Sequence, residues 1–303
     1  MAGSFALSMR RQLAIVEGIK NNAEALAQAE SGIALAESML LIQDPAKRWR
    51  ADGNVYQVDY ANNQTGNGSK VRLRLLSETG KIDINMADQT LLKSVMTHAP
   101  VEEEQQAKLV GAIMDWRDPD DLLNINGAEK SEYKAAGLNY QPRNKPFKSI
   151  EELQMVLGIN EEVYQWLEPL VTVHSRQLKV DVKLASKEVL QVLPDLDASM
   201  IESALQSRLD SAMNKMSASP NPEGVDPGGI VGQNQALTIV SEAQLENGSS
   251  ALISVIVAQS QENPSSPFQV LKWQRSASVD MSLFTDEMSQ LLIAEYAEPE
   301  FNN

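Results

Sequence analysis

The sequence predicts an α+β fold with three parts: a long N-terminal helix, an antiparallel sheet built from two separated stretches, and a large all-α insertion made of two related helical subdomains. Three observations support this prediction. Apolar residues recur at three- to four-residue steps from residue 4 to residue 43. The apolar pattern changes to every second residue in two stretches that flank a helical block. Inside that block, residues 81–92 and 179–190 are similar, which indicates a duplicated unit.

Composition limits what this chain can bind. With 43% apolar and 22% charged residues over 303 positions, it has the composition of a folded protein with a substantial core. A formal net charge of -15 argues against nucleic acid, because binding a phosphate backbone needs a basic face. Cations and basic protein surfaces remain as partners. The absence of cysteine excludes disulfides and thiolate metal sites.

The N-terminal helix is expected from residue 4 to residue 43, where Asp44 and Pro45 end it. At a rise of about 1.5 Å per residue, about forty residues form a rod of roughly 60 Å. Its apolar side chains include Leu13, Val16 and Leu26. We predict that these three bind partner proteins, because no sheet is expected to cover the first half of the helix. An ordinary core helix remains the alternative.

The sheet is expected in two pieces. Residues 54–60 and 70–76 alternate in polarity around the turn-rich stretch 62–69, which is typical of a β-hairpin. Three more alternating stretches, 236–243, 251–258 and 268–274, are joined by the turn signals Asn247-Gly248 and Asn263-Pro264. Two strands before the helical block and three after it would form one interrupted sheet.

These patterns divide the chain into six segments. They are the helix and hairpin at 1–84, a first insert subdomain with an acidic loop at 85–178, a second at 179–216, a linker at 217–234, a β-meander at 235–279 and a C-terminal tail at 280–303. The linker is too rich in proline and glycine for regular structure. In the tail, Phe284, Met288, Leu291 and Leu292 have helical spacing. The four tryptophans, Trp49, Trp116, Trp166 and Trp273, are expected in cores.

The acidic loop gives the strongest chemical signal. Five carboxylates fall within fifteen residues: Asp115, Asp118, Asp120, Asp121 and Glu129. Asn124 and Asn126 add amide oxygens, and Gln141 and Asn144 are further candidates. Crowded anions need a cation or water, and calcium prefers about six to eight oxygen ligands. The spacing does not fit an EF-hand, because alignment on Gly127 puts Leu122 at the first ligand position. A solvated loop, with Asp118 or Asp121 capping a helix, is the alternative.

Taken together, the motifs resemble the minor pseudopilin K family of the type II secretion system. The resemblance lies in their order and spacing along nearly the whole chain, not in any one motif. Its residues are Ile82 to Asn85 with Ala87, Asp115 to Asp120 with Gly127 to Glu129 and Tyr133, Phe147 to Leu153, Val180 to Ala185, and Thr238 to Glu242.

The resemblance implies a pilin-like domain and a structural role. It implies calcium at Asp115, Asp118, Asp120, Asp121 and Glu129, and a protein that caps the tip of a periplasmic pseudopilus and initiates its assembly. The implied partners are the minor pseudopilins I and J, and secreted substrates are a further candidate. Members of the family begin with a cleaved leader and a hydrophobic helix in the inner membrane. Neither is in this sequence, so we expect a periplasmic part of a protein that is anchored in the inner membrane.

Three other functions are weighed against this one. A minor pilin of a related type IV filament would share the architecture but have different partners. Helix-hairpin-helix DNA binding is not expected, because acids follow both candidate turns, Val156 to Asn160 and Leu193 to Asp197, and the second lacks glycine. An enzyme is not expected either. The only histidines, His98 and His174, lie in no metal or nucleophile pattern.

Overall fold

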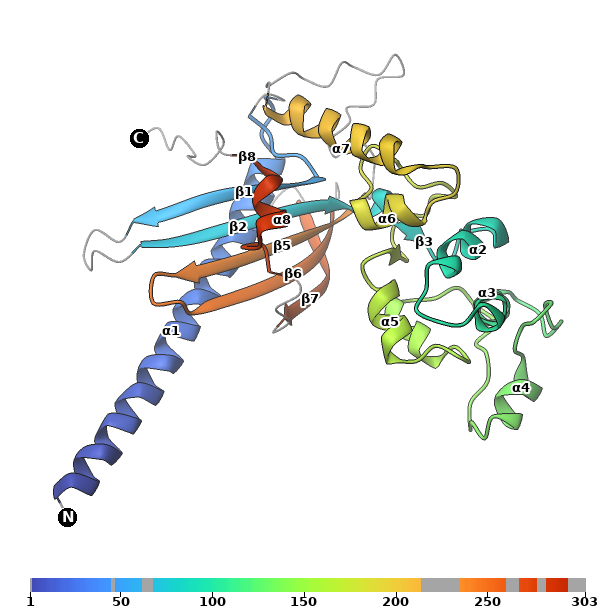
Figure 1. Ribbon diagram of the computed structural model, residues 1–303, viewed down its shortest axis with the longest axis horizontal. Coiled ribbons are helices and arrows are strands. Elements are labelled where there is room, and N and C mark those ends of the chain that lie inside the picture. Colours follow the sequence, from blue (N-terminus) through green and yellow to red (C-terminus); the bar gives the residue numbers. More distant parts are fainter. Residues whose placement is uncertain are drawn as a thin grey trace. The chain divides into compact units, whose positions relative to one another are not determined.

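The computed structural model describes residues 2–44, 47–61, 68–213, 235–259, 267–276 and 282–293 (Figure 1). The chain divides into two compact units. The first is discontinuous and consists of Met1–Leu76 and Arg208–Asn303; the second is Ser77–Ser207. The expected linker 217–234 lies outside the described residues. No helix within the described ranges combines the length and the apolar character needed to cross a membrane.

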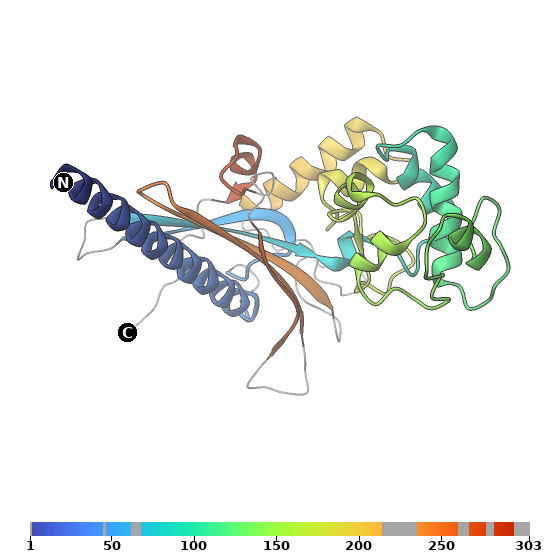
Figure 2. The ribbon, with the colours of Figure 1, turned by 90° about the horizontal axis from the view of Figure 1, so that it is seen from below.

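The first unit is built on helix α1 (Ala2–Leu40), which crosses one face of a sheet (Figures 1 and 2). Its buried positions follow helical spacing: Ala25, Ala29, Ile33, Ala36 and Leu40. This face contacts strands β5 (Ala236–Leu245) and β6 (Ser250–Gln259). Gly32 sits at the closest approach, since a Cβ there would lie 2.4 Å from the Ser241 hydroxyl oxygen. The helix therefore packs closely onto side chains of β5 and of the strand beside it at this point.

The sheet has six strands in the order β7-β6-β5-β2-β1-β8. Strands β1 (Asp52–Ala61) and β2 (Gly68–Ser77) form the expected hairpin, and β5, β6 and β7 (Phe268–Ser276) form the meander. Strand β5 lies beside β2, so the two separated parts make one sheet, as predicted. Alternate residues of β2, namely Val71, Leu73 and Leu75, are fully buried. The predicted α+β fold is confirmed.

The C-terminal segment covers the sheet face opposite α1 (Figure 2). Helix α8 (Asp286–Gln290) is one short turn, and β8 (Leu292–Ile293) pairs with β1 in parallel. The helical spacing of Leu292 was therefore misleading. The buried carboxylate of Glu242 accepts hydrogen bonds from the Ser282 hydroxyl and the Leu283 amide, and Leu283 packs on Val240. These contacts hold the segment on the sheet.

The second unit is mainly helical. Its helices are α2 (Gln89–Thr97), α3 (Glu103–Arg117), α4 (Lys130–Ala135), α5 (Glu161–Leu167), α6 (Lys187–Val192) and the first part of α7 (Ala198–Met213), with 3₁₀ turns η1 (Glu78–Gly80) and η2 (Ile150–Met155). It is not all-α, because β3 (Ile82–Asp83) and β4 (Val171–Thr172) pair in parallel. Such two-residue strands leave no alternation in the sequence to detect.

The duplicated motif folds the same way twice. In the first copy, Asp83 accepts the Asn85 amide on its side chain and the Ala87 amide on its carbonyl. In the second, Asp181 accepts the Lys183 and Ala185 amides in the same manner. Side-chain caps then begin the helices that follow, Asp88 for α2 and Ser186 for α6. The two copies of the motif are thus related in structure as well as in sequence.

Aromatic side chains form part of the core of this unit. Trp116 lies 6.2 Å from Tyr133 and 6.1 Å from Phe147 between ring centroids. Trp116 is fully buried, and Trp166 is partly buried and packs against this core. Trp49 is fully buried in the core of the first unit. Trp273 was expected in a core and is 44% exposed. In the described part of the chain it lies on β7, an edge strand of the sheet.

Candidate metal centre

The acidic loop begins at the C-terminal end of α3, where Asp115 is completely buried. The helix ends at Arg117, and Asp118 is extended because the residue before Pro119 avoids the helical region. Asn124 closes the loop back onto the helix. Its backbone amide donates to Asp115 Oδ1 at 3.1 Å, and its side-chain Nδ2 donates to Asp115 Oδ1 and, at 3.1 Å, to Asp118 Oδ2.

Gly127 is packed against the Asp115 carboxylate. A Cβ at residue 127 would lie 2.0 Å from Asp115 Oδ2, and a Cβ at Gly111 would lie 2.7 Å from the Gly127 Cα. Only glycine fits at either point without displacing its neighbours. The pair therefore lets the loop press against α3 and fixes the position of Asp115 Oδ2.

Three carboxylate oxygens in this region are buried and accept no hydrogen bond: Asp115 Oδ2, Asp118 Oδ1 and Glu129 Oε1. Glu129 is only 6% exposed. Burying a carboxylate oxygen without a partner is costly unless a proton or a cation satisfies it. The donor set and its lack of partners therefore fit a hard cation such as calcium, which takes oxygen ligands.

The electrostatics of the loop agree with this interpretation. Burial raises the pKa of Glu129 to about 7, and the charges of Asp115, Asp118, Asp121 and Asp120 add to the rise. Burial also raises the pKa of Asp118, with further contributions from Asp115 and Asp120 that outweigh its hydrogen bond from Asn124 and the charge of Arg117. The acidic side chains of the loop thus raise the pKa of both Glu129 and Asp118.

The five predicted acids are not all equivalent. Asp115, Asp118 and Glu129 supply the unpartnered oxygens, whereas Asp120 and Asp121 are exposed. Asp120 Oδ1 accepts the Leu122 amide at 2.9 Å. Among the described residues, no group of three or more His, Cys, Asp or Glu side chains is already assembled to hold a metal ion. Which of the five bind an ion stays a prediction.

The amides have roles that the sequence did not separate. Asn124 donates to the acids through its NH₂ group, and exposed Asn126 takes a left-handed conformation with φ of 61°. Gln141 is exposed. Asn144 instead reaches the loop, where its Nδ2 donates to the Asp120 carbonyl at 2.7 Å and to Asp121 Oδ1 at 2.8 Å. Nothing in the sequence near Asn144 distinguishes it from Gln141.

The predicted partner-binding residues lie on α1. Leu13 is 65% exposed and Val16 63% exposed, and the neighbouring Ile15 and Ile19 are similarly open. Leu26 is partly buried and packs against the core of the first unit. The apolar surface that is free for a partner therefore lies in the N-terminal half of the helix.

Comparison with known proteins shows what the central part of the chain is similar to. Residues 69–176, which include the acidic loop, match the family model described as Type II secretion system (T2SS), protein K. Proteins named Type II secretion system protein K are similar over part of the chain. The protein of Pectobacterium carotovorum is 27% identical over 121 residues, 40% of this chain and 35% of that protein. The protein of Dickeya chrysanthemi is 29% identical over 152 residues, 46% of this chain and 40% of that protein.

The matches thus span about two fifths of the length of these relatives. A chain in the crystal structure of the GspK-GspI-GspJ complex from enterotoxigenic Escherichia coli aligns with 89% of this chain and 100% of its own length. Its sequence identity is 18% and its TM-score 0.49. The family match and the named relatives confirm the resemblance found in the sequence: residues 69–176 are similar to protein K of the type II secretion system.

Proposed function

We propose that this chain is a minor pseudopilin that caps and initiates the periplasmic pseudopilus of a type II secretion system. The observation that carries the proposal is the family match over residues 69–176. In this role the protein is a structural component and not an enzyme. It belongs in the periplasm, held at the inner membrane. The names of the relatives favour this role over a minor pilin of a type IV filament.

The proposed partners are the minor pseudopilins I and J of the same system, with secreted substrates as further candidates. The solved complex of GspK with GspI and GspJ prompts this choice. The exposed apolar side chains of α1, including Leu13 and Val16, offer a surface on which other helices can pack. Nucleic acid is not expected, because the chain has a net charge of -15.

Complex formation tests this proposal. Mixing the chain with purified pseudopilins I and J should give a stable ternary complex in size-exclusion chromatography. Replacing Leu13 and Val16 by serine should weaken the complex. The matched control is serine at Leu122 and Leu123, which are also exposed leucines but lie on the acidic loop. Loss of the complex in the control but not in the α1 variant would contradict the assignment of the surface.

The capping role rests on the size of the inserted unit. A unit of this bulk would obstruct addition of a further subunit above it. Replacing residues 77–207 by a short linker should therefore release pseudopili from length control, with longer filaments visible by electron microscopy. Filaments of unchanged length would count against steric capping.

The acidic loop is proposed to bind calcium through Asp115, Asp118 and Glu129, with Asp120 and Asp121 as the remaining candidates. Support comes from the three buried oxygens that accept no hydrogen bond. A bound ion would neutralise the carboxylates and fix the loop against α3.

Thermal unfolding in calcium, in magnesium and in chelator checks this site. A ligand that binds only the folded protein stabilises it by about 2.7 kcal/mol at a hundredfold excess over its dissociation constant. We expect calcium to raise the melting temperature more than magnesium, which tolerates irregular geometry poorly. Equal melting temperatures in calcium and in chelator would mean that the acidic loop does not bind calcium and is only solvated.

A further inference from the structure

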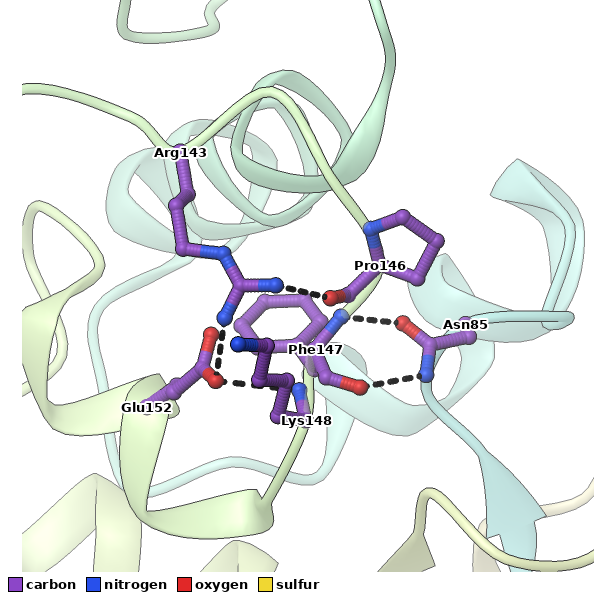
Figure 3. Close-up of polar contacts among 6 residues, drawn as sticks. All are labelled: Asn85, Arg143, Pro146, Phe147, Lys148 and Glu152. Carbon is purple, nitrogen blue, oxygen red and sulfur yellow. Dashed lines mark hydrogen bonds and ion pairs between the residues drawn. The ribbon is translucent and has the colours of Figure 1, made fainter.

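A second segment of the insert is fixed beside the acidic loop by contacts that bridge distant parts of the sequence. Figure 3 shows the first of them: the Asn85 side chain donates to the Phe147 carbonyl at 3.0 Å and accepts the Phe147 amide at 2.7 Å. Both polar groups of the Phe147 backbone are thus used by one side chain. This closed pair holds residue 147 against the segment that follows β3.

The same segment is anchored again through Arg143. Its guanidinium pairs with Glu152 on η2 and donates to the Pro146 carbonyl at 2.8 Å. Glu152 also accepts the Lys148 amide at 3.0 Å (Figure 3). Residues 143–148, called the strap here, are therefore held near both ends. Their conformation is largely fixed without any help from the acidic loop.

Asn144 is the point at which the strap meets the loop. Its backbone is left-handed, with φ of 50°, a conformation that asparagine tolerates better than most residues. Its Nδ2 donates to both the Asp120 carbonyl and Asp121 Oδ1, which fixes the orientation of the amide. Its Oδ1 is buried and accepts no hydrogen bond. A fourth unpartnered oxygen thus accompanies those of Asp115, Asp118 and Glu129.

We propose that the strap is a second wall of the cation site and that Asn144 is its positioning residue, holding the Asp120–Asp121 part of the loop in a conformation ready for the ion. The inference rests on the proposed calcium site. The physical reason is preorganisation. An exposed pair of aspartates must lose conformational freedom to help enclose an ion, and a loop already fixed by the anchored strap loses less. Outer partners of this kind typically contribute about 10- to 100-fold in metal affinity.

Calorimetric titration of calcium into the whole chain tests the proposal with three variants. Asn144→Ala removes the amide. Asn144→Asp keeps an oxygen but loses the NH₂ donor. Lys145→Ala is the matched control: it truncates the exposed neighbour on the same strap, and losing a positive charge there should not weaken cation binding. If Asn144 positions the loop through its Nδ2, both Asn144 variants should bind calcium at least 10-fold more weakly than the unchanged chain. The Lys145→Ala control should bind calcium equally well or more tightly.

A further variant acts on the anchor alone. Arg143→Met breaks the pair with Glu152 without touching the loop and should weaken calcium binding by a smaller factor. Melting temperatures in chelator establish that each variant is folded. Full affinity in Asn144→Ala would overturn the inference while leaving the calcium site intact. Full affinity in Asn144→Asp would overturn it too, because the residue would then act only as an oxygen ligand. A wild-type chain that takes up no calcium would remove the proposed site and the inference together.

Discussion

Glu129 combines the features that make the acidic loop a candidate metal site. The residue is 6% exposed, one of its side-chain oxygens has no hydrogen-bond partner, and burial together with four aspartates raises its pKa. In the absence of an ion, such a group is satisfied at neutral pH only by holding a proton. Proton and calcium therefore compete for the same oxygens, which makes the site sensitive to pH.

The direction of this sensitivity follows from linkage. Glu129 has a pKa of about 7 in the folded chain against an ordinary value of 4.5, so the folded state binds more protons between these values. In chelator, the contribution of Glu129 to stability should increase as the pH falls through 7 and level off below 4.5. The rise in melting temperature caused by calcium should be larger at pH 7.5 than at pH 5.5, because protons then compete less.

Melting curves at the two pH values, with and without calcium, measure this difference. Glu129→Gln is the control, since it cannot titrate and should flatten the pH dependence in chelator. A calcium-induced shift of the same size at both pH values would mean that Glu129 does not take part in binding.

How far the sequence predicts the site is also clearest at this scale. The density of acids indicated a cation site, and the buried oxygens of Asp115, Asp118 and Glu129 fit that interpretation. The side chain of Asn124 could accept a hydrogen bond through its oxygen or donate one through its nitrogen. Only its contacts in the structure show that it donates to the acids. Asn144 meets the loop because Asn85, Arg143 and Glu152 hold the strap in place. A contact that depends on three distant anchors leaves no local pattern.

At the scale of elements, α1 has two different halves. Gly18 lies in the exposed half, and a Cβ there would meet nothing within 4 Å. Gly32 lies over the sheet, and a Cβ there would come within 2.4 Å of Ser241 Oγ and 2.9 Å of Val71 Cγ1. The same residue type therefore serves close packing at one position only.

Replacing each of the two glycines by alanine tests whether the two halves of α1 differ in their packing. Gly32→Ala should destabilise the first unit by about 1–3 kcal/mol, as overpacking does. Gly18→Ala should be neutral or favour the helix by up to about 1 kcal/mol, because alanine loses less backbone freedom than glycine. Denaturant unfolding followed by circular dichroism compares the two. Equal destabilisation would show that the exposed half of α1 is packed in solution.

The elements that the sequence predicted are those in which the apolar pattern extends over a long stretch of residues. The N-terminal helix, the hairpin and the meander each repeat their pattern over many residues. Strands β3, β4 and β8 were missed because each is only two residues long. These strands form because tertiary contacts bring their backbones together, and the local sequence propensity does not reveal such contacts. Trp273 was misplaced for a related reason: its sequence neighbours resemble a central strand, whereas its strand lies at an edge.

At the scale of the molecule, the whole second unit lies in the sequence between the two parts of the chain that form the sheet of the first unit. The sequence predicted this arrangement, since strand patterns stop before the helical block and resume after it. The family match over residues 69–176 lies mostly in the inserted unit, Ser77–Ser207, which also contains the acidic loop. The part of the chain that matches the family model therefore includes the part in which we place the cation.

This arrangement predicts that calcium stabilises one unit and not the other. Each unit has its own buried core, and the proposed ligands all belong to Ser77–Ser207. At a hundredfold excess of calcium over its dissociation constant, amides of α3 and α4 that exchange by unfolding of this unit should exchange about 100-fold more slowly. Amides of β5 and β6 should keep their rates, because all the proposed ligands belong to the second unit. Hydrogen exchange of the whole chain, read by mass spectrometry, resolves both sets at once. Equal slowing in β5 and β6 would mean that the two units unfold together, and the insert would then stabilise the sheet that carries it.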